Sequence, residues 1–244
     1  MNEQTLEKMK QMKLYGMLRS FKNVLESSTM NQLTADELIL QLIENEWEDR
    51  HSRAVERSVR NAKFRYKTSL EMIDYSIDRG LEENMIHRLA ECTFINQHQN
   101  VIITGSTGTG KSFIASAIGH QACMLGYKVY YANTSRLLAQ LKMAKADGSS
   151  FKELALLEKQ DLLILDDFGI QPLDNQNRML LMDIIEDRHG KRSTMIAGQV
   201  PVAAWYDIIG DETLADAILD RIVHDAHQLE LNGESIRRKR KVIN

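Results

Sequence analysis

The stretch Gly105-Ser106-Thr107-Gly108-Thr109-Gly110-Lys111-Ser112 decides the fold of this chain. It follows the apolar run 101–103 and precedes a segment whose apolar residues recur at helical spacing. A strand, a glycine-rich loop ending in Lys-Ser and a helix together form the phosphate-binding loop pattern. The glycines let backbone N–H groups turn inward toward phosphate oxygens, and the helix start adds the positive end of its dipole. The stretch therefore predicts a site for a nucleoside triphosphate.

Two side chains complete the predicted loop. Lys111 can reach the β- and γ-phosphates as a mobile point charge. Ser112 can place its hydroxyl on Mg²⁺, a cation that prefers oxygen ligands. We therefore expect all eight residues to contact the nucleotide and Ser112 to contact the metal as well.

Two adjacent acids, Asp166 and Asp167, follow the apolar run 162–165. Four apolar residues predict a buried strand, and its carboxyl end is where open parallel sheets bind ligands. Asp166 comes 55 residues after Lys111, which leaves room for a helix, a strand and a helix. We expect Asp166 to orient Mg²⁺, through water, and Asp167 to hold the attacking water as a general base.

The remaining pattern after residue 100 alternates between strands and helices. Gln199 follows the strand expected at 193–197, at a place where a polar side chain can sense the γ-phosphate. The further elements are strands at 101–103, 127–132 and 162–165, and helices at 111–125, from 134 to the break at 147, at 175–189 and at 211–226. This order predicts an α/β nucleotide-binding domain.

Composition places the chain among ordinary globular proteins. It has 244 residues, of which 43% are hydrophobic and 27% charged, with a net charge of −3. No apolar run approaches the about 18 residues that span a bilayer, and the polar N-terminus does not resemble a signal peptide. Cys92 and Cys123 have no metal-like spacing, so we expect two reduced thiols in a cytoplasmic, bacterial protein without membrane contacts.

The first 67 residues carry apolar side chains at helical spacing, without strand-like alternation. Thr34 and Glu37 form a capping box, which predicts the start of a helix. Between residues 36 and 49 this segment has six acids and no base. From 50 to 67 the sign reverses, and only Glu56 opposes Arg50, Arg53, Arg57, Arg60, Lys63, Arg65 and Lys67.

The first four of these basic residues are spaced three, four and three apart, which places them along one helix face. Such a face, with Lys63 beyond it, can bind DNA backbone phosphates without sequence preference. It can equally be a solvated face that pairs with the preceding acids. Lys142 and Lys145 are further candidates for DNA contact, with solvated surface as the alternative. Charge pattern alone leaves both choices open.

The pattern divides the chain into three parts. We expect a helical N-terminal domain over 1–67 that makes DNA or oligomer contacts, and a helical connector over 68–99. The nucleotide-binding domain then extends over 100–244 and ends in a basic tail at 237–241.

Three further stretches are more specific than the phosphate loop. They are Gln199-Val200-Pro201 followed by Trp205, Leu214-Ala215-Asp216-Ala217-Ile218-Leu219-Asp220-Arg221, and Gly233-Glu234-Ser235-Ile236-Arg237. With Phe168-Gly169 after the two acids and the helical N-terminal region, they cover nearly the whole chain. Over 1–241 the chain resembles the IstB family of transposition helper ATPases. These are AAA+ proteins related to the bacterial helicase loader DnaC.

The resemblance implies an AAA+ core with a five-stranded parallel sheet and helices on both faces, preceded by a small all-α domain. It implies ATP and Mg²⁺ as cofactors and ATP hydrolysis as the activity. By position Arg221 resembles the arginine that one subunit extends to its neighbour's γ-phosphate, and Arg237 resembles the second sensor arginine. A guanidinium supplied in trans makes nucleotide state and assembly depend on each other.

The resemblance also implies partners. The chain would bind duplex DNA with little sequence preference, form a homo-oligomer with ATP, and recruit and stimulate a partner, IstA-like transposase. That favours the basic helix face as a DNA contact. The chain departs from the AAA+ pattern at two positions: Asp167 stands where Glu is usual, and Gln199 stands where Asn, Ser or Thr is more frequent.

Three other functions compete with this one. A helicase loader would share the core and grip single-stranded DNA. A small-molecule kinase would turn over without DNA, but the helical arm and the lack of an acceptor-substrate lid argue against it. An architectural DNA-binding protein would carry a vestigial nucleotide site.

Overall fold

The computed structural model describes residues 2–27 and 33–236, and it divides into two compact units. The units are Met1–Arg57 and Ser58–Asn244. Helix α3, Ala35–Ala62, contributes to both. The division comes ten residues before the boundary expected at 67, because the end of α3 packs into the core of the second unit, where Ala62 is fully buried.

The N-terminal unit is helical, as its periodicity predicts. It contains α1, Asn2–Gln11, α2, Tyr15–Glu26, and the first part of α3. The capping box is confirmed: the Thr34 amide donates to Glu37 Oε2 at 2.8 Å, and the Glu37 amide donates to Thr34 Oγ1 at 3.3 Å. These reciprocal bonds satisfy backbone donors that a helix start leaves without partners.

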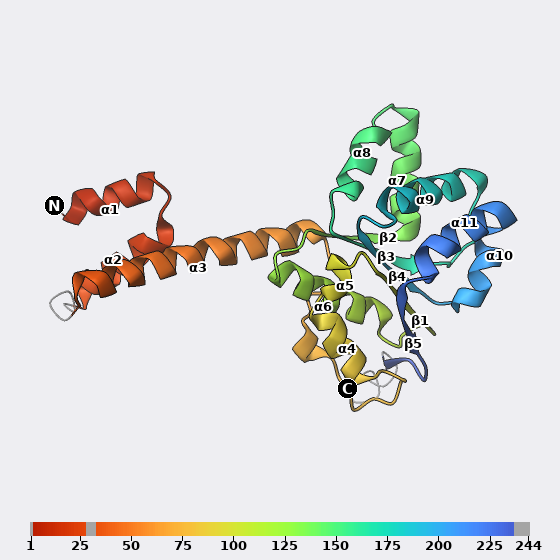
Figure 1. Cartoon of the computed structure of the whole chain (residues 1–244), viewed down its shortest axis with the longest axis horizontal. Helices are drawn as coiled ribbons and strands as arrows, with labels where there is room; N and C mark the ends of the chain where they lie inside the picture. The colour runs from red at the N-terminus through yellow and green to blue at the C-terminus, as the bar shows by residue number, and fades with distance from the viewer. Residues whose placement is uncertain (1, 28–32, 237–244) are drawn as a thin grey trace. The chain divides into compact units, whose positions relative to one another are not determined.

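Helix α2 lies against α3 within this unit (Figure 1). A side chain at Gly16 would overlap the backbone carbonyl of Asn45, so only glycine permits this approach. The buried carboxylate of Glu46 accepts from the amides of Gly16 and Met17, at 2.8 and 3.2 Å. Helix α2 has no side-chain cap of its own, and Glu46 of α3 caps it instead.

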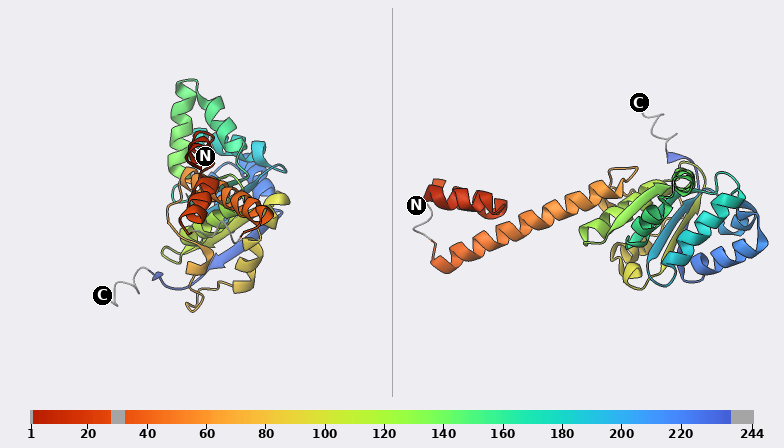
Figure 2. Two further views of the ribbon diagram at one scale, coloured as in Figure 1. Left: turned by 90° about the vertical axis from the view of Figure 1, so that its left-hand side faces the viewer. Right: turned by 90° about the horizontal axis from the view of Figure 1, so that it is seen from above.

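The second unit is built on a five-stranded sheet in the order β2-β3-β4-β1-β5 (Figures 1 and 2). Every neighbouring pair is parallel, which confirms the predicted sheet. The strands are β1, Asn100–Gly105, β2, Val129–Asn133, β3, Leu162–Phe168, β4, Ser193–Gly198, and β5, Ala226–Leu231.

Helices cover both faces of the sheet. One face packs against α4, Glu83–Ala90, α5, Thr93–Asn96, and α6, Lys111–Met124. The other packs against α7, Thr134–Ala146, α8, Ser150–Glu158, α9, Asn175–Arg188, α10, Trp205–Ile209, and α11, Glu212–Val223. Two 3-10 turns, Leu70–Met72 and Val202–Ala204, complete the elements of this unit that the structure describes.

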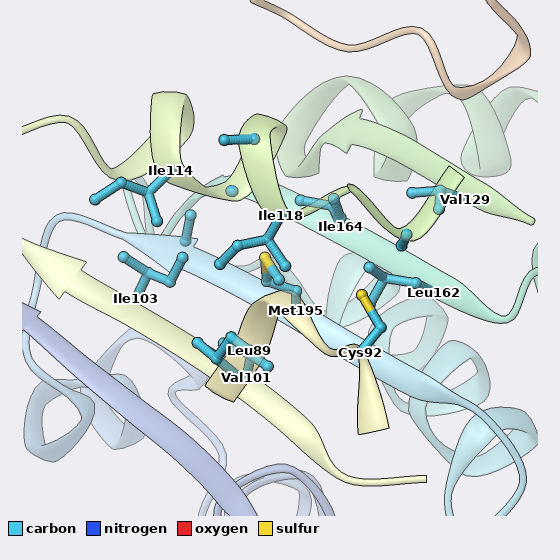
Figure 3. Close-up of a cluster of buried hydrophobic side chains, with 14 of the residues drawn as sticks. Leu89, Cys92, Val101, Ile103, Ile114, Ile118, Val129, Leu162, Ile164 and Met195 are labelled. Atoms are coloured by element: carbon cyan, nitrogen blue, oxygen red, sulfur yellow. The ribbon is translucent and has the colours of Figure 1, made fainter. Parts of the chain in front are cut away.

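Alternate residues of the strands point to opposite faces, so each strand serves two cores. On β1, Val101 and Ile103 belong to the cluster under α6, and Ile102 belongs to the cluster under α7 and α9. Figure 3 shows the first cluster, in which Ile103 lies near Ile114 and Ile118 of α6. Burial on both faces explains why the strands read as continuous apolar runs.

The segment 68–99 is less helical than expected. Between the 3-10 turn and α4, residues 73–82 form no helix. The Asn232 amide donates to the Arg79 carbonyl at 2.8 Å, so this segment is tied to the chain just after β5. A helix would withdraw its backbone from that contact and from the nucleotide pocket described below.

Within the described ranges, no helix combines the length and apolar character needed to cross a bilayer. Cys92 and Cys123 are free and buried. Burial raises the pKa of the Cys92 thiol to about 12.

Candidate functional site

The phosphate loop connects β1 to α6, and its glycines shape it. Gly108 has φ +88°, and a side chain there would overlap Ser235, so the position accepts only glycine. Gly110 is the N-cap of α6. The Ile236 amide donates to the Gly108 carbonyl at 3.0 Å, which holds the segment after β5 against the loop.

Lys111 lies over the loop backbone. Its Nζ donates to the carbonyls of Gly105 and Ser106 at 2.7 and 2.8 Å, and the residue is only 8% exposed. The ammonium therefore stands beside the inward-facing loop, where phosphate oxygens would accept from it.

Asp166 is the centre of a buried polar group. Its Oδ1 accepts from Ser112 Oγ at 2.8 Å, and its Oδ2 accepts from the Tyr131 hydroxyl. Thr134 Oγ1 donates to the Asp166 carbonyl at 2.9 Å. Asp166 is 1% exposed. Burial and the bond to Asp166 raise the pKa of Tyr131, so this phenol remains a donor that orients the carboxylate.

Ser112 and Asp166 fit a hard cation. A hydroxyl and a carboxylate oxygen within hydrogen-bond distance are the ligand types that Mg²⁺ takes, together with phosphate oxygens and water. No cluster of three or more acidic, histidine or cysteine side chains occurs among the described residues. A cation here would therefore depend on the bound phosphates to complete its ligands.

Asp167 points to a different set of partners. Its Oδ2 accepts from Asn133 Nδ2 at 2.9 Å and from Arg65 Nη1 at 2.8 Å. The same Arg65 nitrogen lies 3.2 Å from Asp166 Oδ2. Burial alone would lower the pKa of Arg65, but the charge of Asp167 and the bond to Asp166 outweigh it and raise that pKa. Arg65 therefore bridges the two predicted acids as a permanent cation.

Gln199 lies where the strand order predicts it. It follows β4, and its Oε1 accepts from Thr107 Oγ1 of the phosphate loop at 2.8 Å. The structure thus brings Lys111, Asp167 and Gln199 to one edge of the sheet, at the carboxyl ends of β1, β3 and β4.

A cavity of about 380 Å³ opens at this edge. Its polar lining includes Lys111, Ser112, Asp167 and Gln199. Its apolar lining consists of Tyr66, Met72, Ile77, Phe113, Ile170 and Ile236. Polar groups of the phosphate loop and apolar side chains in one cavity suit the triphosphate and the flat base of a nucleotide, respectively.

Arg79 lines this cavity and contacts the backbone of the phosphate loop. It is 5% exposed, and burial lowers its pKa. Its Nη1 donates to the Thr109 carbonyl at 3.0 Å, and its Nη2 donates to the Asp74 carbonyl at 3.0 Å. Arg79 thereby fixes the segment 74–79 to the phosphate loop.

Sequence reasoning missed Arg65, Arg79, Tyr131 and Asn133. Asn133 carried a usable signal, because it is the last residue of β2 and lies opposite Asp166 of β3. Arg65 lies just after α3 and Arg79 lies in the connector, and no local pattern links either residue to the phosphate loop.

Arg221 lies at the opposite edge of the sheet. The Asn100 side chain, at the start of β1, donates to the Arg221 carbonyl at 3.0 Å. The Arg221 guanidinium pairs with Glu186 at 2.7 Å, and its side chain is 26% exposed. The structure therefore does not bring Arg221 to the phosphate loop of its own chain. Arg237 lies outside the described residues.

The candidate DNA contacts fall into distinct groups. On α3, Arg50 pairs with Glu46 and Arg53 pairs with Asp49, both at 2.6 Å. Arg57 is exposed and forms no ion pair with the described part of the chain. Arg60 is also exposed and forms no described ion pair, and Lys145 is exposed on α7. The Nζ of Lys63 lies 5.6 Å from the centre of the Tyr130 ring. Lys142 pairs with Asp174 at 3.3 Å. The first two arginines thus follow the pairing alternative.

Comparison with solved structures supports the fold. DnaI aligns with a TM-score of 0.57 at 20% identity, over 72% of this chain and 94% of that one. DnaA bound to AMPPCP and single-stranded DNA aligns with a TM-score of 0.57 at 19% identity, over 75% of this chain and 57% of that one. The DnaC helicase loader aligns with a TM-score of 0.50 over 75% of this chain and 99% of that one, at 19% identity. The predicted α/β fold of the phosphate-loop core is thereby confirmed.

Sequence comparison identifies the family. A protein of Sinorhizobium fredii named as insertion sequence ATP-binding protein y4pL is 42% identical over 97% of both chains. A protein of Pseudomonas aeruginosa named as the ATP-binding protein of insertion sequence IS21 is 31% identical over 90% of this chain and 83% of its own length. Residues 7–243 match the family described as IstB-like ATP binding protein. The chain is a member of the IstB-like ATP-binding protein family.

Proposed function

We propose that this chain is an ATP-hydrolysing assembly factor of an insertion sequence. With ATP it forms a homo-oligomer on duplex DNA, and it recruits and stimulates the partner transposase. The observation that carries the proposal is that Lys111, Ser112 and Asp167 line one cavity, with the buried Asp166 bonded to Ser112 at 2.8 Å. The names of the relatives, which place them in insertion sequences, supply the biological setting.

The residues of the cavity suit hydrolysis of the γ-phosphate. Lys111 and the loop amides would bind the phosphates, and Ser112 and Asp166 would hold Mg²⁺, which neutralises charge on the phosphates when bound. Asp167 would accept a proton from water as the water oxygen bonds to the γ-phosphorus and the bond to the bridging oxygen breaks, giving ADP and phosphate. Gln199 would orient the γ-phosphate or the water.

Two observations support the assembly and DNA-binding parts of the proposal. Arg221 lies at the amino end of β1, and the phosphate loop lies at the carboxyl end of the same strand. An arginine placed there can serve a neighbour's nucleotide and not its own. The exposed Arg57 and Arg60 supply cations for DNA phosphates, and such contacts would be independent of sequence and sensitive to salt.

The test is the size of the particle by light scattering, with ATP, with ADP and without nucleotide, each with and without duplex DNA. We expect large assemblies only when ATP and duplex DNA are both present. Lys111→Ala should lose ATP binding and assembly together, because the ammonium that holds the phosphates is gone. Lys159→Ala, an exposed lysine at the end of α8, is the matched control and should behave like wild type.

Two results would contradict the proposal. Normal large assemblies of Lys111→Ala would refute the coupling of nucleotide and assembly. A strong preference for single-stranded over duplex DNA at matched salt would favour a helicase loader.

A further inference from the structure

A second cavity, of about 430 Å³, lies beside the nucleotide pocket and shares Arg65 and Asp167 with it. It is bounded by β2, by the first turns of α7 and by the segment that follows α3. Its lining includes Lys63, Arg65, Arg136, Tyr130, Asn133 and Gln140. Nothing in the proposed hydrolysis uses Lys63, Arg136 or Gln140.

The acids of this cavity are already engaged. Asp166 is buried and bonded to Ser112 and Tyr131. Asp167 accepts from Asn133 and Arg65. Both carboxylates are therefore paired with donors of the cavity lining, so they repel an anionic ligand only weakly.

Two of the cations, in contrast, face no carboxylate. Lys63 stands over the Tyr130 ring, and neither Lys63 nor Arg136 forms an ion pair with any residue in the described ranges. Arg65 adds a third cation, and both of its carboxylate contacts use Nη1. Its Nε and Nη2 form no hydrogen bond to described residues, and its side chain is 41% exposed.

A group that matches these donors must be anionic and must present several oxygens. A guanidinium fork binds two oxygens of one phosphate, and an ammonium adds a point charge. The Asn133 and Gln140 amides already donate to Asp167 and Glu153, at 2.9 and 3.0 Å. Each has a second N–H that can donate to the remaining oxygens. A phosphate group fits this chemistry.

We propose that the second cavity binds a phosphate group, and that this group draws Arg65 away from Asp167. The proposal rests on the proposed role of Asp167 in hydrolysis. While Arg65 donates to Asp167 Oδ2 at 2.8 Å, that carboxylate oxygen is occupied. A phosphate in the second cavity competes for the same guanidinium and leaves Asp167 to accept a proton from water. The phosphate can belong to a DNA backbone or be free in solution.

The first arm of the test measures binding without hydrolysis. Inorganic phosphate is titrated calorimetrically into the Lys111→Ala protein, in which the nucleotide pocket is disabled. We expect binding, and at least a tenfold loss of affinity when Lys63→Ala and Arg136→Ala are added. Equal binding with and without those two changes would overturn the site for free phosphate. The same pair of changes in the otherwise wild-type chain, titrated with duplex DNA, tests the backbone source. If the two changes alter neither the affinity for phosphate nor the affinity for duplex DNA, the site is overturned altogether.

The second arm measures the consequence for Asp167. Arg65→Ala should hydrolyse ATP without DNA or added phosphate faster than the wild type does under the same conditions, because its Asp167 is always released. Its rate should stay below the DNA-stimulated rate of the wild type, because the neighbour's Arg221 is supplied only within an assembly. Arg65→Lys, which keeps the charge, should restore part of the repression. Arg192→Ala is the matched control and should hydrolyse ATP like the wild type. Arg192 pairs with Asp161 at 2.9 Å, and their side chains are 42% and 23% exposed. Arg65 pairs with Asp167 at 2.8 Å, and their side chains are 41% and 22% exposed.

The outcomes separate the two proposals. If Arg65→Ala and Arg65→Lys both keep the wild-type response to DNA, the release of Asp167 is refuted. If the wild type hydrolyses no ATP under any condition, the proposed function fails, and the phosphate titration still decides whether the cavity is a site.

Discussion

Asp167 combines a strained backbone with a predicted chemical role. Its φ is +57°, in the left-handed region, at the irregularity where β3 leaves the register of β4 between Leu165 and Phe168. Asp and Asn tolerate this region better than most residues, at a cost of about 1–3 kcal/mol for a non-glycine. The conformation turns the carboxylate out of the strand and toward Asn133 and Arg65.

Asp167→Asn isolates the role of the carboxylate. The amide accepts the same backbone conformation and cannot take a proton, so we expect turnover to fall by about 100-fold or more. Affinity for a fluorescent ATP analogue should stay within about threefold of wild type, since Lys111 and Ser112 are untouched. Asp161→Asn, just before the other end of β3, is the control. If Asp167→Asn releases phosphate from ATP at the wild-type rate, another residue is the general base.

Local patterns predicted only part of the site. The phosphate loop and Asp166 were predictable because each lies at the carboxyl end of a strand that an apolar run identifies. In a parallel sheet these carboxyl ends lie together, so residues there meet at one site. Gln199 was predictable for the same reason, after β4. Arg65 was not, because it reaches Asp167 across 102 sequence positions and through a side chain whose direction no short-range pattern sets.

At the scale of elements, the contact of α2 with α3 depends on one buried acid. Glu46 accepts from two amides in the first turn of α2 and from Arg50 Nε at 2.6 Å. Burial alone would raise the pKa of Glu46, but these bonds outweigh it and lower that pKa. A lowered carboxylate pKa stabilises the fold above the unfolded value of about 4.3, and that stability is lost as pH falls through the folded value.

Glu46→Ala should therefore weaken α2 in a pH-dependent way. We expect a loss of about 1–3 kcal/mol at neutral pH, since two buried amides lose their acceptor. Hydrogen exchange of the α2 amides in the full chain measures it. Protection in the wild type should fall as pH drops below about 4.3, and protection in the variant should be flatter across that range. Glu48→Ala, exposed on the same helix, should match wild type. Unchanged protection of Glu46→Ala would show that the bonds contribute nothing.

The basic residues of α3 are not equivalent. Arg50 and Arg53 pair with acids one turn earlier, whereas Arg57 and Arg60 form no described ion pair. We expect Arg57→Ala with Arg60→Ala to weaken duplex binding strongly and to flatten its log-log salt dependence by about two units, one for each contact. Arg50→Ala with Arg53→Ala should have a smaller effect. Equal losses in a salt titration would mean that DNA displaces the acids easily.

The strands and helices of the nucleotide-binding domain were predicted more reliably than the connector. The five strands have continuous apolar runs or flanking turns, and both faces of the sheet are buried, so burial dictates the pattern. The segment 73–82 was expected to be helical. Its conformation instead follows contacts with the phosphate loop and the end of β5, which are distant in sequence.

At the scale of the whole molecule, the proposed trans role of Arg221 would make hydrolysis a property of the assembly. Asn100 and Gly105 are five residues apart on β1, about 16 Å at about 3.3 Å per residue. Arg221 contacts the first of these residues, and the phosphate loop begins at the second. Self-contact is therefore excluded by the length of the strand.

Mixing two inactive variants tests this arrangement. Arg221→Ala keeps an intact pocket, and Asp167→Asn keeps Arg221. Neither should hydrolyse ATP alone, but their mixture should recover part of the wild-type turnover, because some sites combine one intact pocket with one intact arginine. Arg192→Ala, at the same edge of the sheet, should be active alone. A mixture no more active than its components would exclude Arg221 as the residue supplied in trans.

The nucleotide cavity is closed by Ile236, whose amide is bonded to the phosphate loop. This residue follows β5, so the ribosome makes it after every strand of the sheet. A nascent chain can therefore pair its strands before it has a complete base pocket. We therefore expect nucleotide to bind chains whose sheet is already formed and not to guide the pairing of the strands.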